Sequence, residues 1–268
     1  MEPPTDSTAQ RTSATYRLAV EDIDFLQRDE MRPIRLALEY AKVALCLQDW
    51  GIRSTIIVFG SARALSPERL AELPADDVTE QMRRQAAWYE EARLFGRIAS
   101  ERGGAFAPHH RWRDNVIATG GGPGIMEAAN RGAWEAGAPS VGLNVTLPHE
   151  QAPNPYATPE LCFRFHYFAM RKMHLATHAS ALVVFPGGFG TLDELFEILT
   201  LVQTDKTPAL PIVLFGEAYW RRIINFEALV EEGMVLPEHL SLFDFADSAE
   251  AAWAALTRRG LLSHAREG

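Results

Sequence analysis

Cysteine and lysine are scarce in this chain of 268 residues. Cysteine occurs only at Cys46 and Cys162, which excludes a disulfide framework and a cysteine-rich zinc site. Lysine occurs only at Lys42, Lys172 and Lys206, and the remaining basic residues are arginines. Arginine suits bidentate recognition of phosphate and carboxylate groups, but a GC-rich genome would produce the same bias.

Long apolar runs and an excess of positive charge are also missing. No run approaches the roughly 18 apolar residues of a spanning helix, and the first residues lack the basic and apolar regions of a signal peptide. We therefore expect a cytoplasmic protein without a membrane partner. The formal net charge is -9, which argues against DNA or RNA as the main partner. Residues 1–18 are rich in Thr, Ser and Pro, and we expect them to be disordered.

Short apolar runs alternate with helical patterns along the rest of the chain. Such alternation predicts βαβ units and a parallel sheet covered by helices. The expected strands lie within 54–60, 115–124, 140–147, 163–168, 181–188, 211–216 and 240–245. The expected helices lie within 22–50, 79–102, 125–137, 169–179, 191–203, 217–229 and 248–258. The fold class is thus α/β, a Rossmann-like doubly wound sheet, with one domain over 19–268 that includes a helical N-terminal extension.

Two glycine-rich turns stand where an expected strand gives way to an expected helix. Backbone N–H groups and the helix dipole make such turns suitable for anions, although a plain tight turn is the alternative. The first turn contains Gly120, Gly121 and Gly122, and the second contains Gly187, Gly188 and Gly190, followed by Thr191. A weaker third candidate is the segment Gly60-Ser61-Ala62-Arg63, which follows the first expected strand. Together these turns predict a phosphate or nucleotide site.

The spacing of these glycines narrows the choice of nucleotide. A dinucleotide fingerprint would require a third glycine at position 125 or 193, where the chain has Ile125 and Asp193. No Gly-Lys pair occurs, so a P-loop is excluded. A mononucleotide or a sugar phosphate fits better than a dinucleotide or a nucleoside triphosphate.

Charged side chains near these turns are candidates for chemistry. Glu194 lies three residues after Thr191 on the same helical face, near a helix start whose dipole favours the ionised form. A carboxylate there could activate water or stabilise an oxocarbenium ion, and a solvent-facing acid is the alternative. Arg171 and Lys172 could reach a phosphate or ribose, and two solvated helix charges are the alternative.

The histidines do not indicate a metal site. His174 and His178 are four residues apart, but a zinc protease motif would place Glu where Leu175 stands. His109 and His110 fall in an expected surface loop. We therefore expect no metal.

These motifs together resemble the LOG (Lonely Guy) family. PGGFGTLDE at 186–194 is similar to the family's PGGxGTxxE signature, and GGGPGIMEAAN at 120–130 is similar to its GGGxxGLM segment. AMRKMHLA at 169–176 resembles its RK-containing helix, and STIIVFGSAR at 54–63 resembles the longer bacterial branch. The resemblance covers about residues 22–258.

The resemblance implies hydrolysis of the N-glycosidic bond of a cytokinin or other purine nucleoside 5′-monophosphate, without a cofactor. Arg171 and Glu194 match the family's catalytic pair, and residues 187–191 and 120–122 match its two glycine loops. It also implies a homodimer or larger homo-oligomer, with a hexamer among the assemblies of longer members. The common label of lysine decarboxylase has no support here, because that reaction calls for a Schiff-base lysine in a suitable context.

These motifs do not identify the base of the substrate, and they are also compatible with a second function. The segment at 105–114 resembles a local insertion, and we expect it to reshape access for the base. A non-catalytic nucleotide or molybdenum-cofactor carrier or sensor on the same fold is the alternative function. The presence of both Arg171 and Glu194 favours an enzyme.

Overall fold

A computed structural model describes residues 6–106, 108–146 and 152–262. The chain divides into two units, one up to Lys42 and one from Val43 onward. The boundary lies inside the helix α3 (Arg32–Asp49). The single domain expected over 19–268 stays a prediction. The disorder expected for residues 1–18 stays a prediction.

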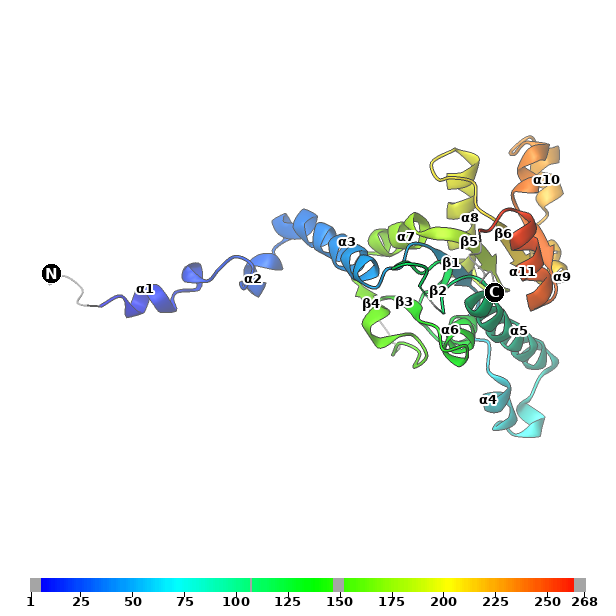
Figure 1. The fold of residues 1–268 in the computed structure, drawn as a ribbon, viewed down its shortest axis with the longest axis horizontal. Coiled ribbons are helices and arrows are strands. Elements are labelled where there is room, and N and C mark those ends of the chain that lie inside the picture. Colours follow the sequence, from blue (N-terminus) through cyan, green and yellow to red (C-terminus); the bar gives the residue numbers. More distant parts are fainter. Residues whose placement is uncertain (1–5, 107, 147–151, 263–268) are drawn as a thin grey trace. The chain divides into compact units, whose positions relative to one another are not determined.

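The N-terminal unit consists of short helices joined by turns (Figure 1). Its elements are α1 (Thr8–Thr12), η1 (Ala14–Tyr16), α2 (Ile23–Leu26), η2 (Asp29–Met31) and the first part of α3, where η denotes a 3-10 helix. The expected single helix over 22–50 is therefore interrupted before Arg32. Pro33 explains the interruption, because proline lacks an N–H group and clashes with the preceding turn except at a helix start.

The larger unit contains a parallel sheet that has seven strands within the described residues, in the order β4-β3-β2-β1-β5-β6-β7 (Figure 1). The strands are β1 (Thr55–Phe59), β2 (Val116–Thr119), β3 (Ser140–Val145), β4 (Cys162–Phe165), β5 (Ala179–Val184), β6 (Ile212–Phe215) and β7 (Asp244–Ala246). Every residue of β1, β2 and β6 is buried, as in a parallel strand covered on both faces. The expected Rossmann-like fold is confirmed.

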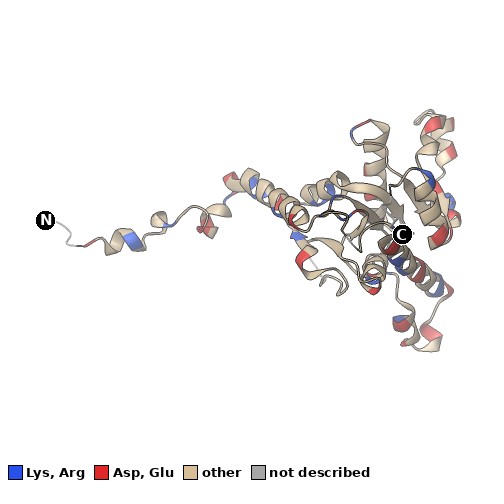
Figure 2. Ribbon diagram, viewed as in Figure 1, with Lys and Arg blue, Asp and Glu red and all other residues tan. Residues whose placement is uncertain are grey.

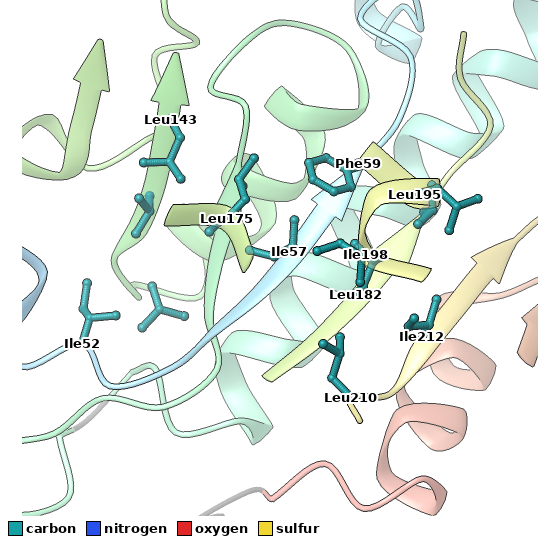
Figure 3. Packing of buried hydrophobic residues seen from close by; sticks show 14 of the residues in the cluster. Ile52, Ile57, Phe59, Leu143, Leu175, Leu182, Leu195, Ile198, Leu210 and Ile212 are labelled. Carbon is teal, nitrogen blue, oxygen red and sulfur yellow. The ribbon is translucent and has the colours of Figure 1, made fainter. Parts of the chain in front are cut away.

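Helices cover both faces of this sheet. Side chains alternate along β1, so that Ile56 and Val58 face one core and Ile57 and Phe59 face the other. The first core includes residues of α5 (Glu80–Arg102), α6 (Ile125–Glu135) and α11 (Ala249–Arg258). The second includes residues of α7 (Phe168–Thr177), α8 (Phe189–Gln203), α9 (Glu217–Ile223) and α10 (Phe226–Glu231). Figure 3 shows Ile57 and Phe59 among side chains of this second core.

Several element boundaries differ from the expected ones. The helix expected over 217–229 breaks into α9 and α10, because the side chain of Asn225 accepts a hydrogen bond from Ala228 N and starts a new helix. The segment 66–78 contains α4 (Pro67–Ala71), capped by Ser66. Residues 240–242 of the strand expected at 240–245 instead belong to the 3-10 helix η5 (Pro237–Leu242), and β7 begins at Asp244.

The order of the strands determines where a ligand can enter. The chain runs from β1 through β2 and β3 to β4 in one direction, then returns to β5 beside β1 and continues in the other direction. This reversal creates a crevice beyond the carboxyl ends of β1 and β5, the usual ligand position in open α/β sheets. The turns at Ser61 and at Gly187 follow these two strands.

Candidate active site

A cavity of about 850 Å³ opens at the carboxyl ends of β1, β2 and β5. It is lined by all three turns that the sequence singled out, through Ser61, Gly120 and the segment 187–191. Arg171 and Glu194 line the same cavity. A volume of this size is typical of small-molecule sites.

Backbone hydrogen bonds join the turns to one another. Ser61 N donates to Pro186 O over 3.0 Å, and Ile125 N donates to Ser61 O over 3.0 Å. Ile125 begins α6, so the turn after β1 is held between the start of α6 and the turn before α8. Gly124 adopts a φ of 70°, and a β-carbon there would lie 2.3 Å from Ser61 O. Glycine is therefore required at this junction.

The turn after β5 presents open backbone to the cavity. A β-carbon at Gly188 or Gly190 would meet nothing within 4 Å, whereas one at Gly187 would lie 2.2 Å from Thr191 Oγ1. Helix α8 begins at Phe189, and the first N–H groups of a helix have no acceptor inside it. The hydroxyl of Tyr219 donates to Gly187 O over 2.5 Å and steadies the turn.

Only part of the other glycine turn reaches the cavity. Gly120 lines it, but Gly121 and Gly122 do not. Instead, Asn154 N donates to Gly121 O over 2.8 Å and the Asn154 amide donates to Gly122 O over 3.1 Å. Asn130, which is fully buried, accepts a hydrogen bond from the Asn154 amide over 3.0 Å. The carbonyl oxygens of Gly121 and Gly122 are thus held by Asn154, and these two residues support the turn without lining the cavity.

Arg171 of α7 and Glu194 of α8 form a buried ion pair on the cavity wall. Their side chains are 11% and 12% exposed, and an N–H of Arg171 donates to Glu194 Oε1. The Arg171 guanidinium lies 4.8 Å from the centre of the Phe168 ring. Among the described residues, no hydrogen-bond partner faces the buried Arg171 Nε. The solvent-facing alternative is therefore wrong for Arg171 and for Glu194.

Burial raises the pKa of Glu194 to about 7, despite the opposing effect of the Arg171 charge. The expectation that the helix dipole keeps Glu194 ionised is corrected here. Because α8 begins at Phe189, two residues earlier than expected, Glu194 lies beyond the first turn. The dipole effect fades within that turn, so desolvation dominates.

Lys172 faces away from this pair. Its ammonium group lies 2.8 Å from Asp193 and 3.2 Å from Glu197, outside the main cavity. Successive residues on a helix point about 100° apart, so Arg171 and Lys172 cannot share one site. The structure places Lys172 in a surface ion-pair cluster.

Several lining residues were not identified from the sequence. Gln81, Gln85 and Trp88 of α5 line the cavity, together with Tyr219. The spacing of the three α5 residues, four and then three apart, could have indicated one helical face. Nothing in the sequence shows that this face meets the turn after β5, where the rings of Trp88 and Tyr219 lie 5.7 Å apart.

The segment 105–114 does not border the cavity in its described part. It leads into the amino end of β2, with Arg113 donating to Ala105 O over 2.8 Å, whereas the cavity lies at the carboxyl ends. A role of this segment in base access stays a prediction. His109 and His110 are exposed, as expected.

The described residues offer neither a metal-binding cluster nor a membrane-spanning helix. They contain no cluster of three or more His, Cys, Asp or Glu side chains that could hold a metal ion. They also contain no helix with the length and apolar character needed to span a bilayer.

Comparison with known proteins places these residues in a family. Residues 126–256 match the family model described as "Possible lysine decarboxylase". The protein named cytokinin riboside 5′-monophosphate phosphoribohydrolase LOG1, from Arabidopsis thaliana, is 28% identical over 142 residues, covering 51% of this chain and 64% of that protein. These matches support membership of the LOG family.

One further curated relative and one solved structure are similar to this chain at low identity. The Oryza sativa subsp. japonica protein named "Probable cytokinin riboside 5'-monophosphate phosphoribohydrolase LOG4" is 27% identical over 146 residues, covering 53% of this chain and 62% of its own length. The chain thus spans less than two thirds of these relatives. The X-ray structure of TM1055 has a TM-score of 0.47 and 20% identity, covering 76% of this chain and 99% of that one.

Proposed function

We propose that this protein binds a purine nucleoside 5′-monophosphate and hydrolyses its N-glycosidic bond, giving the free base and ribose 5-phosphate. The buried Arg171–Glu194 pair on the wall of the cavity carries this proposal. A desolvated carboxylate and guanidinium are costly to bury, so their placement beside a ligand cavity favours a chemical role. The curated names of the LOG relatives support the same reaction class.

In this proposal the phosphate binds at Gly187–Thr191. The open backbone of Gly188 and Gly190 allows the phosphate to approach closely, and the start of α8 offers N–H donors. The ribose then extends toward Arg171 and Glu194 on the neighbouring wall. Arg171 orients Glu194 and lies on the cavity wall beside the sugar.

The proposed chemistry needs the ionised form of Glu194. The bond between the anomeric carbon and the base nitrogen breaks, and its electron pair leaves with the base. A water oxygen bonds to the anomeric carbon, and the base nitrogen takes up a proton that balances the one this water loses. A carboxylate beside that carbon stabilises the developing positive charge or orients and deprotonates the water. In a buried site this interaction is stronger than it would be in water.

Lysine decarboxylation fits the site poorly. A pyridoxal phosphate enzyme needs a lysine amine beside the cofactor. Lys172 is held by Asp193 and Glu197, and none of the described residues that line the main cavity is a lysine. The family description alone does not support that activity for this chain.

The test is product analysis with AMP. Purified protein is incubated with AMP, and adenine and ribose 5-phosphate are measured by chromatography and mass spectrometry. The proposal predicts both products in equal amounts and none from adenosine. Binding of AMP without adenine release would instead favour the carrier or sensor function. A panel of purine and N6-substituted purine nucleotides then identifies the preferred base.

The assembly and the compartment also stay predictions. We propose a homodimer or larger homo-oligomer in the cytoplasm, on the basis of the family. Light scattering at micromolar concentration tests the assembly, and a monomer would contradict it.

A further inference from the structure

The phosphate of a nucleotide would bring more negative charge into the cavity than the Arg171–Glu194 pair can balance. Arg171 is already paired with Glu194, and Lys172 is paired outside the cavity. Among the described lining residues, Arg63 is the one other cationic side chain. The negative charge of the 5′-phosphate must therefore be balanced either by Arg63 or by backbone dipoles alone.

Arg63 lies in a turn that is fixed between two helix starts. Ser61 N donates to Pro186 O, just before α8, and Ser61 O accepts from Ile125 N, the first residue of α6. Arg63 N donates to Ser61 Oγ over 3.1 Å, which orders the turn locally. Arg63 thus projects from the junction where two helix dipoles present their positive ends.

The guanidinium of Arg63 is uncommitted. The structure records no ion pair or hydrogen bond from it to any described residue, although the chain is rich in arginine–carboxylate pairs. Arg97 of α5, for example, pairs with Glu101 on a helix surface where basic and acidic residues alternate (Figure 2). A free guanidinium fork on a cavity wall is suited to bidentate binding of phosphate.

We propose that Arg63 is the charge partner of the substrate's 5′-phosphate, so that the site selects a 5′-phosphorylated ligand over the nucleoside. This assignment rests on the proposed function and adds a binding residue to it. Arg63 grips the phosphate across the cavity from the turn at 187–191. Arg171 is thereby left to position Glu194 and the sugar.

The experiment compares Arg63→Met, Arg63→Lys and the matched surface control Arg97→Met by calorimetry. The ligands are AMP, ribose 5-phosphate and adenosine. Losing a charge-assisted hydrogen-bonded contact typically weakens binding by about 10- to 100-fold. We expect that loss in Arg63→Met for both phosphate ligands and none for adenosine. Arg63→Lys should lose less, and Arg97→Met should bind like the unmodified protein.

The outcomes separate this assignment from the hydrolase proposal. Unchanged affinity of Arg63→Met for ribose 5-phosphate, or equal losses for AMP and adenosine, would overturn the role of Arg63 alone. Binding of AMP that depends on Arg63 without any adenine release would overturn the hydrolase proposal alone. Failure of the unmodified protein to bind either phosphate ligand would overturn both. Circular dichroism of each variant checks that the fold is retained.

Discussion

Helices α7 and α8 hold two ion-pair clusters that face in different directions. Arg171 and Glu194 point into the cavity, with side chains 11% and 12% exposed. Lys172 pairs with Asp193 and Glu197 on the other side, where the two acids are 57% and 35% exposed. Each member of the inner pair is the sequence neighbour of a member of the outer cluster.

The difference between the clusters lies in solvation. Water screens the outer cluster, so its contribution to stability is small. The inner pair has lost its water, and burial raises the pKa of Glu194 to about 7. Replacing such a pair by apolar residues is often neutral or stabilising, so stability alone does not explain it. From this comparison we expect the inner pair to act on a substrate and the outer cluster to be an ordinary surface ion-pair cluster.

The largest expected effect is that of Glu194→Gln against its neighbour Asp193→Asn. Glutamine keeps the shape but can neither carry negative charge nor accept a proton, so kcat for AMP should fall by roughly a hundredfold or more. Asp193→Asn should stay within about threefold of the unmodified protein, since surface charges contribute little. Steady-state adenine release measures both, and similar losses in the two variants would break the comparison.

The next effect is that of Arg171→Met against Lys172→Met. The Arg171 charge lowers the pKa of Glu194, so its removal should raise that pKa above about 7 and leave less carboxylate at neutral pH. Together with lost contacts to the sugar phosphate, this should lower kcat/KM by about 10- to 100-fold. Lys172→Met should change kcat/KM little. Equal losses in the two variants would indicate that both cations touch the substrate.

The smallest effect concerns stability. Lys172→Met should change the free energy of unfolding by less than about 1 kcal/mol, as expected for a partly exposed ion-pair cluster. Urea denaturation followed by circular dichroism measures this change. A loss of several kcal/mol would mean that the outer cluster is a structural element, and its contrast with the inner pair would then disappear.

The sequence predicted much of the fold because its signals are local. The buried run at 55–59 and the glycine turns at 120–122 and 187–190 mark parallel strands and their exits, and the structure confirms these elements. Boundaries set by tertiary contacts were harder to predict. Helix α8 starts at Phe189 rather than Thr191, and this shift changed the electrostatic interpretation of Glu194.

The sequence predicted only some of the residues of the candidate site. Motif spacing brought out Arg171, Glu194 and the turn at 187–191, but it grouped Lys172 with them, because adjacency in sequence says nothing about which face is buried. Trp88 and Tyr219 come from α5 and α9, and only the strand order brings them together. Local sequence patterns therefore could not show that these two side chains line the same cavity.

The pH dependence of kcat/KM for AMP tests the central claim most directly. With a pKa of about 7, Glu194 is protonated and neutral below that pH and ionised above it. Its carboxylate fraction rises from about 10% at pH 6 to about 90% at pH 8, so a carboxylate mechanism predicts a rise of roughly tenfold with a midpoint near 7. The phosphate of AMP also titrates near pH 6, and Glu194→Gln reports that contribution by itself. A profile that falls over this range, or a rise that persists unchanged in Glu194→Gln, would contradict the account.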